Sequence, residues 1–387
     1  MSVVGPAGFV AAGVACGIKP TGDPDLALVV AAEAAVTAAA FTTNRAAAAP
    51  VVVSRRHRAA APRSRAVVVN SGCANAGTGP RGLEDARTMA EATAEAVGCA
   101  PEEVLVCSTG PIGAYLPIEA VRAGIAAAAE VLGDDEEAGD AAARAIMTTD
   151  TVPKTTVVEA DGFVVGGMAK GAGMVRPDMA TMLAVLTTDA VVDDEVLAEA
   201  FTGAVDRSFH ALDLDGCPST NDAVILLASG ASGHRPSPLE LAGAVTTAAV
   251  HLVEQLAADA EGAERVVVME ITGAADDVEA REAGRAMADS ALVRAAFHGG
   301  DPNWGRLLGA LGATSIDFEP ERFSVWFEGV QVAAEGRPAE FDEAALVERL
   351  AEGDFELRVD LGVGTGRAVV FTTDLTPDYV RFNAERS

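Results

Sequence analysis

Short apolar runs and longer alanine-rich segments alternate along the chain. The short runs predict strands, at 26–30, 38–42, 51–53, 66–69, 103–107, 155–159, 163–165, 182–186, 223–227 and 265–271. The longer segments predict helices, at 82–97, 118–131, 136–146, 194–206, 239–258, 278–297 and 342–350. Strands and helices are mixed without a regular βαβ alternation. We therefore expect a mixed α/β (α+β) fold and not a doubly wound nucleotide fold.

The chain is 387 residues long, which exceeds one ordinary hydrophobic core and predicts two lobes. The segment of about 310–387 is expected to form a smaller, strand-rich C-terminal lobe. Half of the residues are hydrophobic and 22% are charged, a composition typical of globular proteins. The net charge of −29 argues against nucleic acid or an anionic membrane as a partner, because both attract basic surfaces.

The cysteines indicate the redox compartment of the protein, and the histidines indicate whether it binds a metal ion. The five cysteines form no CxxC pair and most lie in apolar surroundings, so we expect buried free thiols in a reducing compartment. The apolar stretch near the N-terminus is too short to span a bilayer and lacks a preceding basic region, so we expect a cytoplasmic protein. The five histidines are scattered, with no i, i+4 pair, so no metal site is expected.

One irregular stretch, residues 168–183, differs from the rest of the chain. It places Lys170 among glycines and then enters the apolar run 182–186 with no polar linker. Thr181 stands at that junction. A threonine there is usually only the start of a strand, because strands favour β-branched residues. The alternative is that Thr181 is a nucleophile.

A nucleophilic threonine needs a base, and the sequence limits which groups could be that base. No Gly-x-Ser-x-Gly elbow is present, so a Ser-His-Asp hydrolase lacks its motif. A threonine can use its own α-amino group as the base, but only as the first residue of a chain. Such an amine has a reference pKa of about 7.7–8.0, close to working pH. For Thr181, the Ala180–Thr181 bond would first have to be cut.

A second candidate is the turn Ser108-Thr-Gly-Pro-Ile-Gly113, which follows the predicted strand 103–107. A strand that ends in such a turn leaves backbone N–H groups unpaired at its tip. These groups can hold an anion or the oxygen of a tetrahedral intermediate. Alternatively, the turn simply reverses the chain.

Several longer strings together resemble one family. They are Ala12-Gly-Val-Ala-Cys-Gly-Ile-Lys19, Phe41-Thr-Thr-Asn44, Ser108-Thr-Gly110, Ile146-Met-Thr-Thr-Asp-Thr-Val-Pro-Lys154, Gly167-Met-Ala-Lys-Gly-Ala-Gly-Met174, Met179-Ala-Thr-Met-Leu183, Ser219-Thr-Asn-Asp222 and Asp301-Pro-Asn-Trp-Gly-Arg306. In this order they resemble the ornithine acetyltransferases of arginine biosynthesis (the ArgJ type, bifunctional glutamate N-acetyltransferase/amino-acid acetyltransferase). The resemblance runs nearly end to end and implies a DmpA/ArgJ-like, self-processing N-terminal-nucleophile fold.

The resemblance also implies a mechanism. The precursor would cut itself between Ala180 and Thr181, giving an α chain of 1–180 and a β chain of 181–387. Thr181 would accept the acetyl group of N-acetylornithine, and glutamate would then collect it as N-acetylglutamate. No cofactor is implied, although acetyl-CoA is a possible co-substrate. The partners would be small amino-acid substrates and the chain's own second fragment, in an α2β2 heterotetramer.

Site residues carry over from the family position by position. Thr109 and Gly110 match its oxyanion-stabilising pair. The positions that match its substrate-binding residues are Thr148, Lys170, Thr181, Glu261, Asn383 and Ser387. We expect Lys170 to hold a substrate carboxylate and Glu261 to face the second amino group of ornithine.

The sequence departs from the family pattern where substrate would be recognised. Cys217 and Pro218 replace a common Asp-Thr pair, and Cys73 replaces an asparagine. The last three residues lack the family's tyrosine, so the match to the family is weaker at Ser387 than at Asn383. Three alternatives therefore stay open: a relative acting on another amino acid, an N-terminal-nucleophile amidase or aminopeptidase, and an uncut binding protein.

Overall fold

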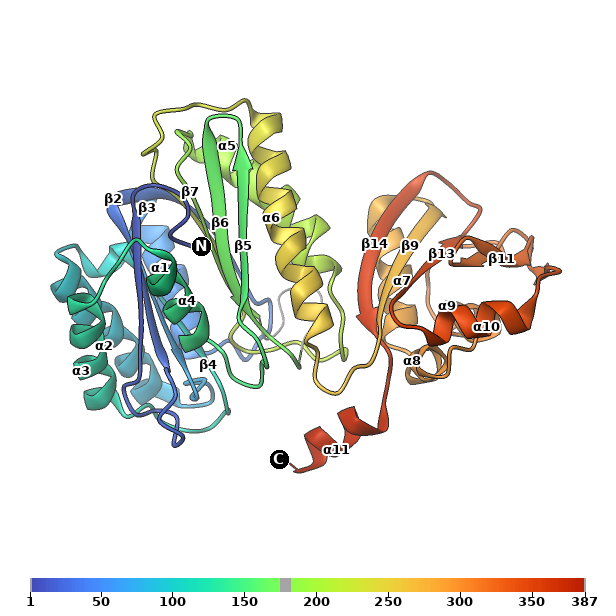
Figure 1. Cartoon of the computed structure of the whole chain (residues 1–387), viewed down its shortest axis with the longest axis horizontal. Helices are drawn as coiled ribbons and strands as arrows, with labels where there is room; N and C mark the ends of the chain where they lie inside the picture. The colour runs from blue at the N-terminus through green and yellow to red at the C-terminus, as the bar shows by residue number, and fades with distance from the viewer. Residues whose placement is uncertain (1, 175–181, 386–387) are drawn as a thin grey trace. The chain divides into compact units, whose positions relative to one another are not determined.

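A computed structural model describes residues 2–174 and 182–385, which form two compact units (Figure 1). The first unit comprises Met1–Gly171, Asp178–Ser208 and Pro218–Leu256. The second comprises Ala172–Pro177, Phe209–Cys217 and Ala257–Ser387. Both units draw on segments from either side of the predicted cut, so the units differ from the predicted fragments. The C-terminal segment of about 310–387 lies within the second unit, together with the elements that precede it from residue 257 onward.

The first unit contains an eight-stranded sheet flanked by helices. Its strands are β1 (Phe9–Val14), β2 (Leu26–Phe41), β3 (Arg63–Ser71), β4 (Val104–Thr109), β5 (Lys154–Ala160), β6 (Phe163–Lys170), β7 (Leu183–Thr188) and β8 (Ala223–Ala228). Its helices are α1 (Ala49–Ala60), α2 (Gly79–Val97), the 3-10 turn Pro101–Glu103, α3 (Ile118–Glu130), α4 (Glu136–Ala145), α5 (Asp194–Arg207) and α6 (Pro238–Ala258).

The sheet has the strand order β4-β3-β2-β8-β7-β6-β5, with β1 pairing on β2. Only β3/β4 and β7/β8 are parallel, and the other neighbours are antiparallel. The 16-residue strand β2 joins the two halves, because its start pairs with β3 and its end with β8. The expected mixed fold is confirmed, and this pattern of antiparallel pairs is not that of a doubly wound sheet.

The two halves of this sheet share one apolar core. Side chains of β3 and β4, such as Val67 and Leu105, belong to the same buried cluster as Val185 of β7 and Ile225 of β8. A second buried cluster joins the other face of β3 and β4 to helices α1, α2 and α3. Helix α6 lies along β5, where the Gln255 side chain bonds the Thr155 backbone through both N–H and C=O (Figure 1).

The second unit contains a six-stranded sheet in the order β12-β11-β10-β13-β9-β14, in which only β9/β13 is parallel. Its strands are β9 (Val266–Ala274), β10 (Ser324–Phe327), β11 (Val330–Ala334), β12 (Arg337–Pro338), β13 (Phe355–Asp360) and β14 (Gly366–Thr373). Its helices are the 3-10 turn Phe209–Ala211, α7 (Asp277–Ala288), α8 (Ala291–His298), α9 (Trp304–Leu311), α10 (Glu343–Ala351) and α11 (Pro377–Glu385).

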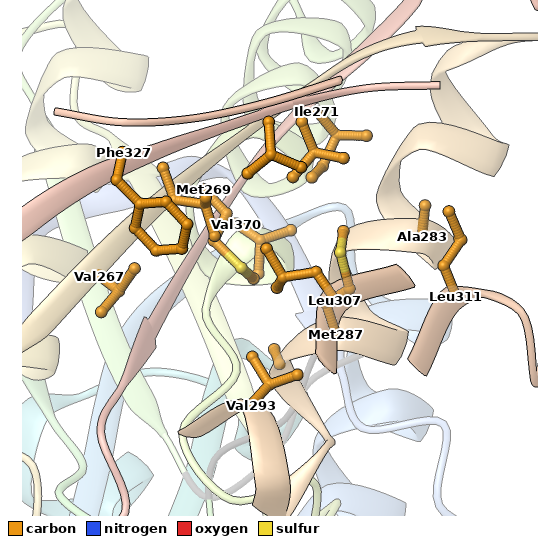
Figure 2. Close-up of a cluster of buried hydrophobic side chains, with 14 of the residues drawn as sticks. Val267, Met269, Ile271, Ala283, Met287, Val293, Leu307, Leu311, Phe327 and Val370 are labelled. Atoms are coloured by element: carbon orange, nitrogen blue, oxygen red, sulfur yellow. The ribbon is translucent and has the colours of Figure 1, made fainter. Parts of the chain in front are cut away.

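The core of the second unit is apolar throughout the part shown in Figure 2. Alternate residues of β9, such as Met269 and Ile271, point to one face of the sheet, as a period of two requires. Helices α7 and α9 cover that face with Met287 and Leu311. Leu311 is fully buried.

Three sequence predictions about elements were wrong. The run 51–53 is part of helix α1, where Pro50 occupies the first turn and Val51 and Val53 face the core. Three valines are too short a run to separate a buried strand from one face of a helix. The helix expected at 278–297 is two helices, because Ser290 accepts a bond from Val293 N–H and starts α8. Strands 26–30 and 38–42 are the two ends of the single strand β2.

Helix α6 is the one described helix that is long and apolar enough to cross a membrane. Half of its most apolar window is buried inside the protein. Leu241, Val245 and Leu252 of this helix are fully buried. Its apolar face is therefore used in the core of the first unit, as in many buried helices.

Candidate active site

The turn after β4 is built around Gly110. Its φ is 135°, and a Cβ at this position would lie 2.5 Å from the backbone nitrogen of Cys73. A side chain is excluded on both grounds. The Cys73 N–H donates to the Thr109 carbonyl at 3.0 Å, which fixes the turn against the loop after β3. The Thr109–Gly110 pair is therefore held in one defined conformation.

Buried polar side chains hold the residue before this pair. The Asn221 amide donates to the Ser108 carbonyl at 2.9 Å and to the Ala74 carbonyl at 2.7 Å. The Ser108 hydroxyl donates to Asn70 Oδ1 at 2.5 Å. Such a satisfied buried network rigidifies the site that it surrounds.

Lys170 is the last residue of β6, and its side chain is buried beside Thr109. The Lys170 Nζ donates to Thr109 Oγ1 at 3.1 Å, and Lys170 is only 2% exposed. Lysine is rarely buried this deeply unless it is paired or functional. Two of the predicted site residues are thus in direct contact.

Asp150 connects Lys170 to Thr148. One carboxylate oxygen accepts from Gly171 N–H at 2.8 Å and from Lys154 Nζ at 2.6 Å. The other accepts from Thr148 N–H at 2.9 Å. The Asp150 and Lys154 side chains are fully buried. The carboxylate therefore binds the backbone of both segments that carry predicted substrate-binding residues.

The charge state of Asp150 follows from this environment. Burial raises the pKa of the carboxyl group, whereas the positive charges of Lys170 and Lys154 lower it. Together with the hydrogen bonds to Asp150, they lower its pKa to about 2. Asp150 is therefore ionised at neutral pH.

The start of β7 lies at the same edge of the sheet. Leu183 pairs with Lys170 on one side and with Ala223 on the other. Met182 donates its N–H to Asp222 Oδ1 at 2.9 Å. Asp222 is fully buried, and burial raises its pKa well above the usual value.

Glu261 and Asn383 meet in the second unit. Asn383 lies on α11 and its amide donates to Glu261 Oε2 at 3.3 Å. The Glu261 N–H donates to the Ala172 carbonyl at 2.7 Å. A Cβ at Gly173 would lie 2.4 Å from the same carboxylate, so Gly173 permits its approach. Two more predicted site residues are thus brought together.

Three predicted site residues, Ala180, Thr181 and Ser387, lie outside the described residues. The roles assigned to the site residues stay predictions. Of the residues that depart from the family pattern, Cys73 is buried and its thiol donates to the Ala114 carbonyl at 3.4 Å, whereas Cys217 is exposed.

One group among the described residues could hold a metal ion, although the sequence predicted no metal site. Ligand atoms of Glu264, His298 and Asp374 lie within 4.8 Å of one another. Two backbone N–H groups already bond Asp374 Oδ1. The Arg265 guanidinium lies 3.9 Å from Asp374 Oδ2 and opposes a cation there.

Sequence reasoning missed Asp150, Lys154 and Asp222 as parts of the site. All three stand in strings that resemble the family, but no role was assigned to them. The spacing of Asp150 and Lys154 and the position of Asp222 directly before an apolar strand were the available signals. A charged residue that flanks an all-apolar strand is more often exposed, so the sequence alone gave no reason to place it inside.

Comparison with known proteins decides the family. The ArgJ family model matches residues 10–387 of the chain. The arginine biosynthesis bifunctional protein ArgJ of Streptomyces coelicolor is 47% identical over 387 residues, which cover 100% of both chains. The protein of the same name from Thermobifida fusca is 48% identical over 388 residues, again covering 100% of both. The chain belongs to the ArgJ family.

Membership confirms the resemblance and makes the chain an acyltransferase of arginine biosynthesis. A solved ArgJ structure from Bacillus halodurans is 32% identical, with a TM-score of 0.50. The match covers 51% of this chain and 96% of that chain. This likeness agrees with the ArgJ-like fold expected from the sequence.

Proposed function

We propose that this ArgJ-family protein transfers an acetyl group from N2-acetyl-L-ornithine to L-glutamate through an acetyl ester on Thr181. The observation that supports it best is the contact between Lys170 and Thr109 at the edge of the sheet. Lys170 pairs across the sheet with Leu183, two residues after Thr181. The chain that leaves β6 therefore returns to the same edge directly after the proposed nucleophile.

The precursor would activate itself first. The Thr181 hydroxyl adds to the Ala180 carbonyl, the C–N bond breaks, and an ester forms with a free α-amine on Thr181. Water then hydrolyses the ester and leaves Thr181 as the first residue of the β chain. Its amine is then available as the base for the next reaction.

Acetyl transfer would use the same hydroxyl. The α-amine takes the hydroxyl proton as Thr181 adds to the acetyl carbonyl of the donor. The negative oxygen that develops is stabilised by donors of the Thr109–Gly110 turn, because fixed dipoles act strongly in a buried site. Ornithine leaves with the proton, and the glutamate amine then takes the acetyl group by the reverse sequence.

Substrate recognition would divide between two charges. Lys170 binds a substrate carboxylate, and Glu261 binds the second amino group of ornithine. Asn383 donates to Glu261, and Asp150 binds the backbone of Thr148 and of Gly171, the residue after Lys170. We further propose a cytoplasmic α2β2 assembly, and acetyl-CoA as a second acetyl donor for N-acetylglutamate synthesis.

A denaturing gel tests the nucleophile. Wild type is expected to give two fragments, 1–180 and 181–387, and Thr181→Ala is expected to give one chain. An intact wild-type band would contradict the self-cleavage step.

A product assay tests the reaction. Purified protein is incubated with N-acetylornithine, with and without glutamate, and ornithine, acetate and N-acetylglutamate are measured. N-acetylglutamate and ornithine should form in equal amounts, and only with glutamate present. Acetate release that ignores glutamate would instead indicate an amidase. A parallel reaction with acetyl-CoA and glutamate tests the second donor.

A further inference from the structure

The segment Ser219–Asp222, just before β8, has no part in the proposed reaction but touches both sides of the site. Asn221 donates to the carbonyl of Ser108, the residue before the Thr109–Gly110 turn. Its neighbour Asp222 accepts from the Met182 N–H at 2.9 Å. Two adjacent residues thus fix the oxyanion turn and the start of β7.

Asp222 is bonded to the peptide group next to Thr181. The Met182 N–H belongs to the peptide that joins Thr181 to Met182, and Asp222 Oδ1 accepts from it. The Met182 carbonyl accepts from Ala223 N–H at 3.2 Å. Both backbone groups of Met182 are therefore held by the start of β8.

The second oxygen of Asp222 is unusual. Asp222 is 0% exposed, and among the described residues no hydrogen-bond partner reaches its Oδ2. A buried oxygen without a partner costs about 1–3 kcal/mol, so native proteins keep few of them. Burial raises the pKa of this carboxyl group well above its usual value, despite the Met182 N–H, the Thr42 hydroxyl and the Lys170 charge. Because Oδ1 accepts the Met182 N–H, a proton carried by this carboxyl group would sit on Oδ2.

We propose that the Asp222 carboxyl group carries the proton in self-cleavage at Ala180–Thr181, an inference that rests on the proposed function. As the Thr181 hydroxyl adds to the Ala180 carbonyl, the C–O bond forms and the C–N bond breaks. The Oδ2 proton goes to the departing Thr181 nitrogen, and the hydroxyl proton returns to the carboxylate. The acid is regenerated and no other reactant is consumed.

Two substitutions separate this role from a purely structural one. Asp222→Asn keeps the shape and an oxygen that can accept from Met182, but it has no acidic proton. Asp222→Glu keeps the acid but changes the shape. If Asp222 transfers a proton, the Asp222→Glu variant should cleave itself faster than the Asp222→Asn variant. If its role is structural, the order should be reversed.

The rate of cleavage is measured on newly made full-length chain, labelled during cell-free synthesis and sampled over time on a denaturing gel. We expect Asp222→Asn to slow cleavage by about a hundredfold or more, because general acid–base catalysis contributes roughly 10²–10⁴-fold. Asp222→Glu should retain a measurable part of the rate. Circular dichroism of the purified variants checks that they fold.

Asp85→Asn is the matched control. Asp85 is also a buried carboxyl group of the first unit, burial raises its pKa, and its Oδ2 has no hydrogen-bond partner among the described residues. It lies on α2, and its variant should cleave like wild type. Wild-type cleavage in Asp222→Asn would overturn the proposal, and so would failure of both Asp222 variants. If wild type itself stays uncut, the proposed function fails instead.

Discussion

The interior of the second unit and the sheet edge of the first unit bury very different side chains. Around Met269 and Leu311 the buried cluster of the second unit is built from aliphatic and aromatic side chains. The edge around Lys170 buries two ammonium groups and two carboxyl groups. They belong to Lys154, Lys170, Asp150 and Asp222. Burying charge costs free energy, whereas burying methylene groups gains it. The contrast indicates that the second unit's core serves stability and that the first unit's edge is retained for chemistry.

The two carboxyl groups at that edge also differ from each other. Asp150 receives an ammonium group and two backbone N–H groups, and its pKa falls to about 2. Asp222 receives the Met182 N–H on Oδ1 and a bond from the Thr42 hydroxyl, and burial raises its pKa despite both. Two buried carboxyl groups therefore have pKa values shifted in opposite directions, because the number and charge of the donors differ. One carboxyl group is suited to hold cations and the other to hold a proton.

The largest stability effect is expected from Asp150→Asn in a Thr181→Ala background, where all variants stay uncut. The substitution removes the negative charge 2.6 Å from Lys154 in a fully buried pair. Removing one partner of such a pair costs about 4 kcal/mol, because the remaining charge keeps its desolvation penalty. Urea unfolding followed by circular dichroism measures the loss.

A double variant serves as the control. Asp150→Asn with Lys154→Met removes both charges and should recover most of the lost stability. No recovery would mean that the loss comes from the backbone hydrogen bonds to Thr148 and Gly171 or from the charge of Lys170, which stays buried in both variants. In the self-cleaving background, we expect the double variant to stay impaired in acetyl transfer, since Lys170 also loses its neighbouring charge.

A substitution in the second unit is expected to cause a comparable loss of stability without a change in activity. Leu311→Ala leaves a cavity in an apolar core and should cost about 3 kcal/mol. The variant that remains folded should keep the wild-type KM for N-acetylornithine. A raised KM would show that the apolar core also shapes the site.

The sequence predicted much of the fold because most elements are long and have a clear period. Strand 223–227 and helix 239–258 match β8 and α6 closely. The valines at 51–53 were assigned to a strand because three residues cannot show a period of 3.6. Helix α11 was not predicted, and only Pro377 at its start signals it.

The site was less predictable than the fold. Resemblance to a family located Thr109, Lys170 and Glu261, but sequence spacing could not show that Lys170 touches Thr109 across 61 residues. Asp150 and Asp222 were missed because local sequence does not reveal burial of a charged residue. Asp222 accepts from Met182 and Asp150 accepts from Gly171, and only the folded sheet brings these distant donors to the two carboxyl groups.

Acid should remove a smaller part of the stability. The folded-state pKa of Asp150, about 2, lies below the reference value of 3.8. Its ionisation therefore stabilises the fold above about pH 4, and this contribution is lost as the pH falls towards 2. The shift corresponds to on the order of 2 kcal/mol. The double variant at 150 and 154 should lack this pH dependence, and an identical acid transition in both chains would contradict the assignment.

The smallest effect on stability is expected from Asp222→Asn. Its dependence on pH has the opposite sign to that of Asp150. Because the folded-state pKa of Asp222 is raised, the unfolded chain releases this proton first as the pH increases. Wild-type stability should therefore decline from about pH 4 upward, until the folded carboxyl group also ionises. Asparagine does not titrate, so the variant should be more stable than its parent at pH 8 and similar to it near pH 3. The comparison is again made by urea unfolding in the Thr181→Ala background. If the variant is instead the less stable chain at pH 8, Asp222 is ionised beside Lys170, and the two carboxyl groups play the same electrostatic role.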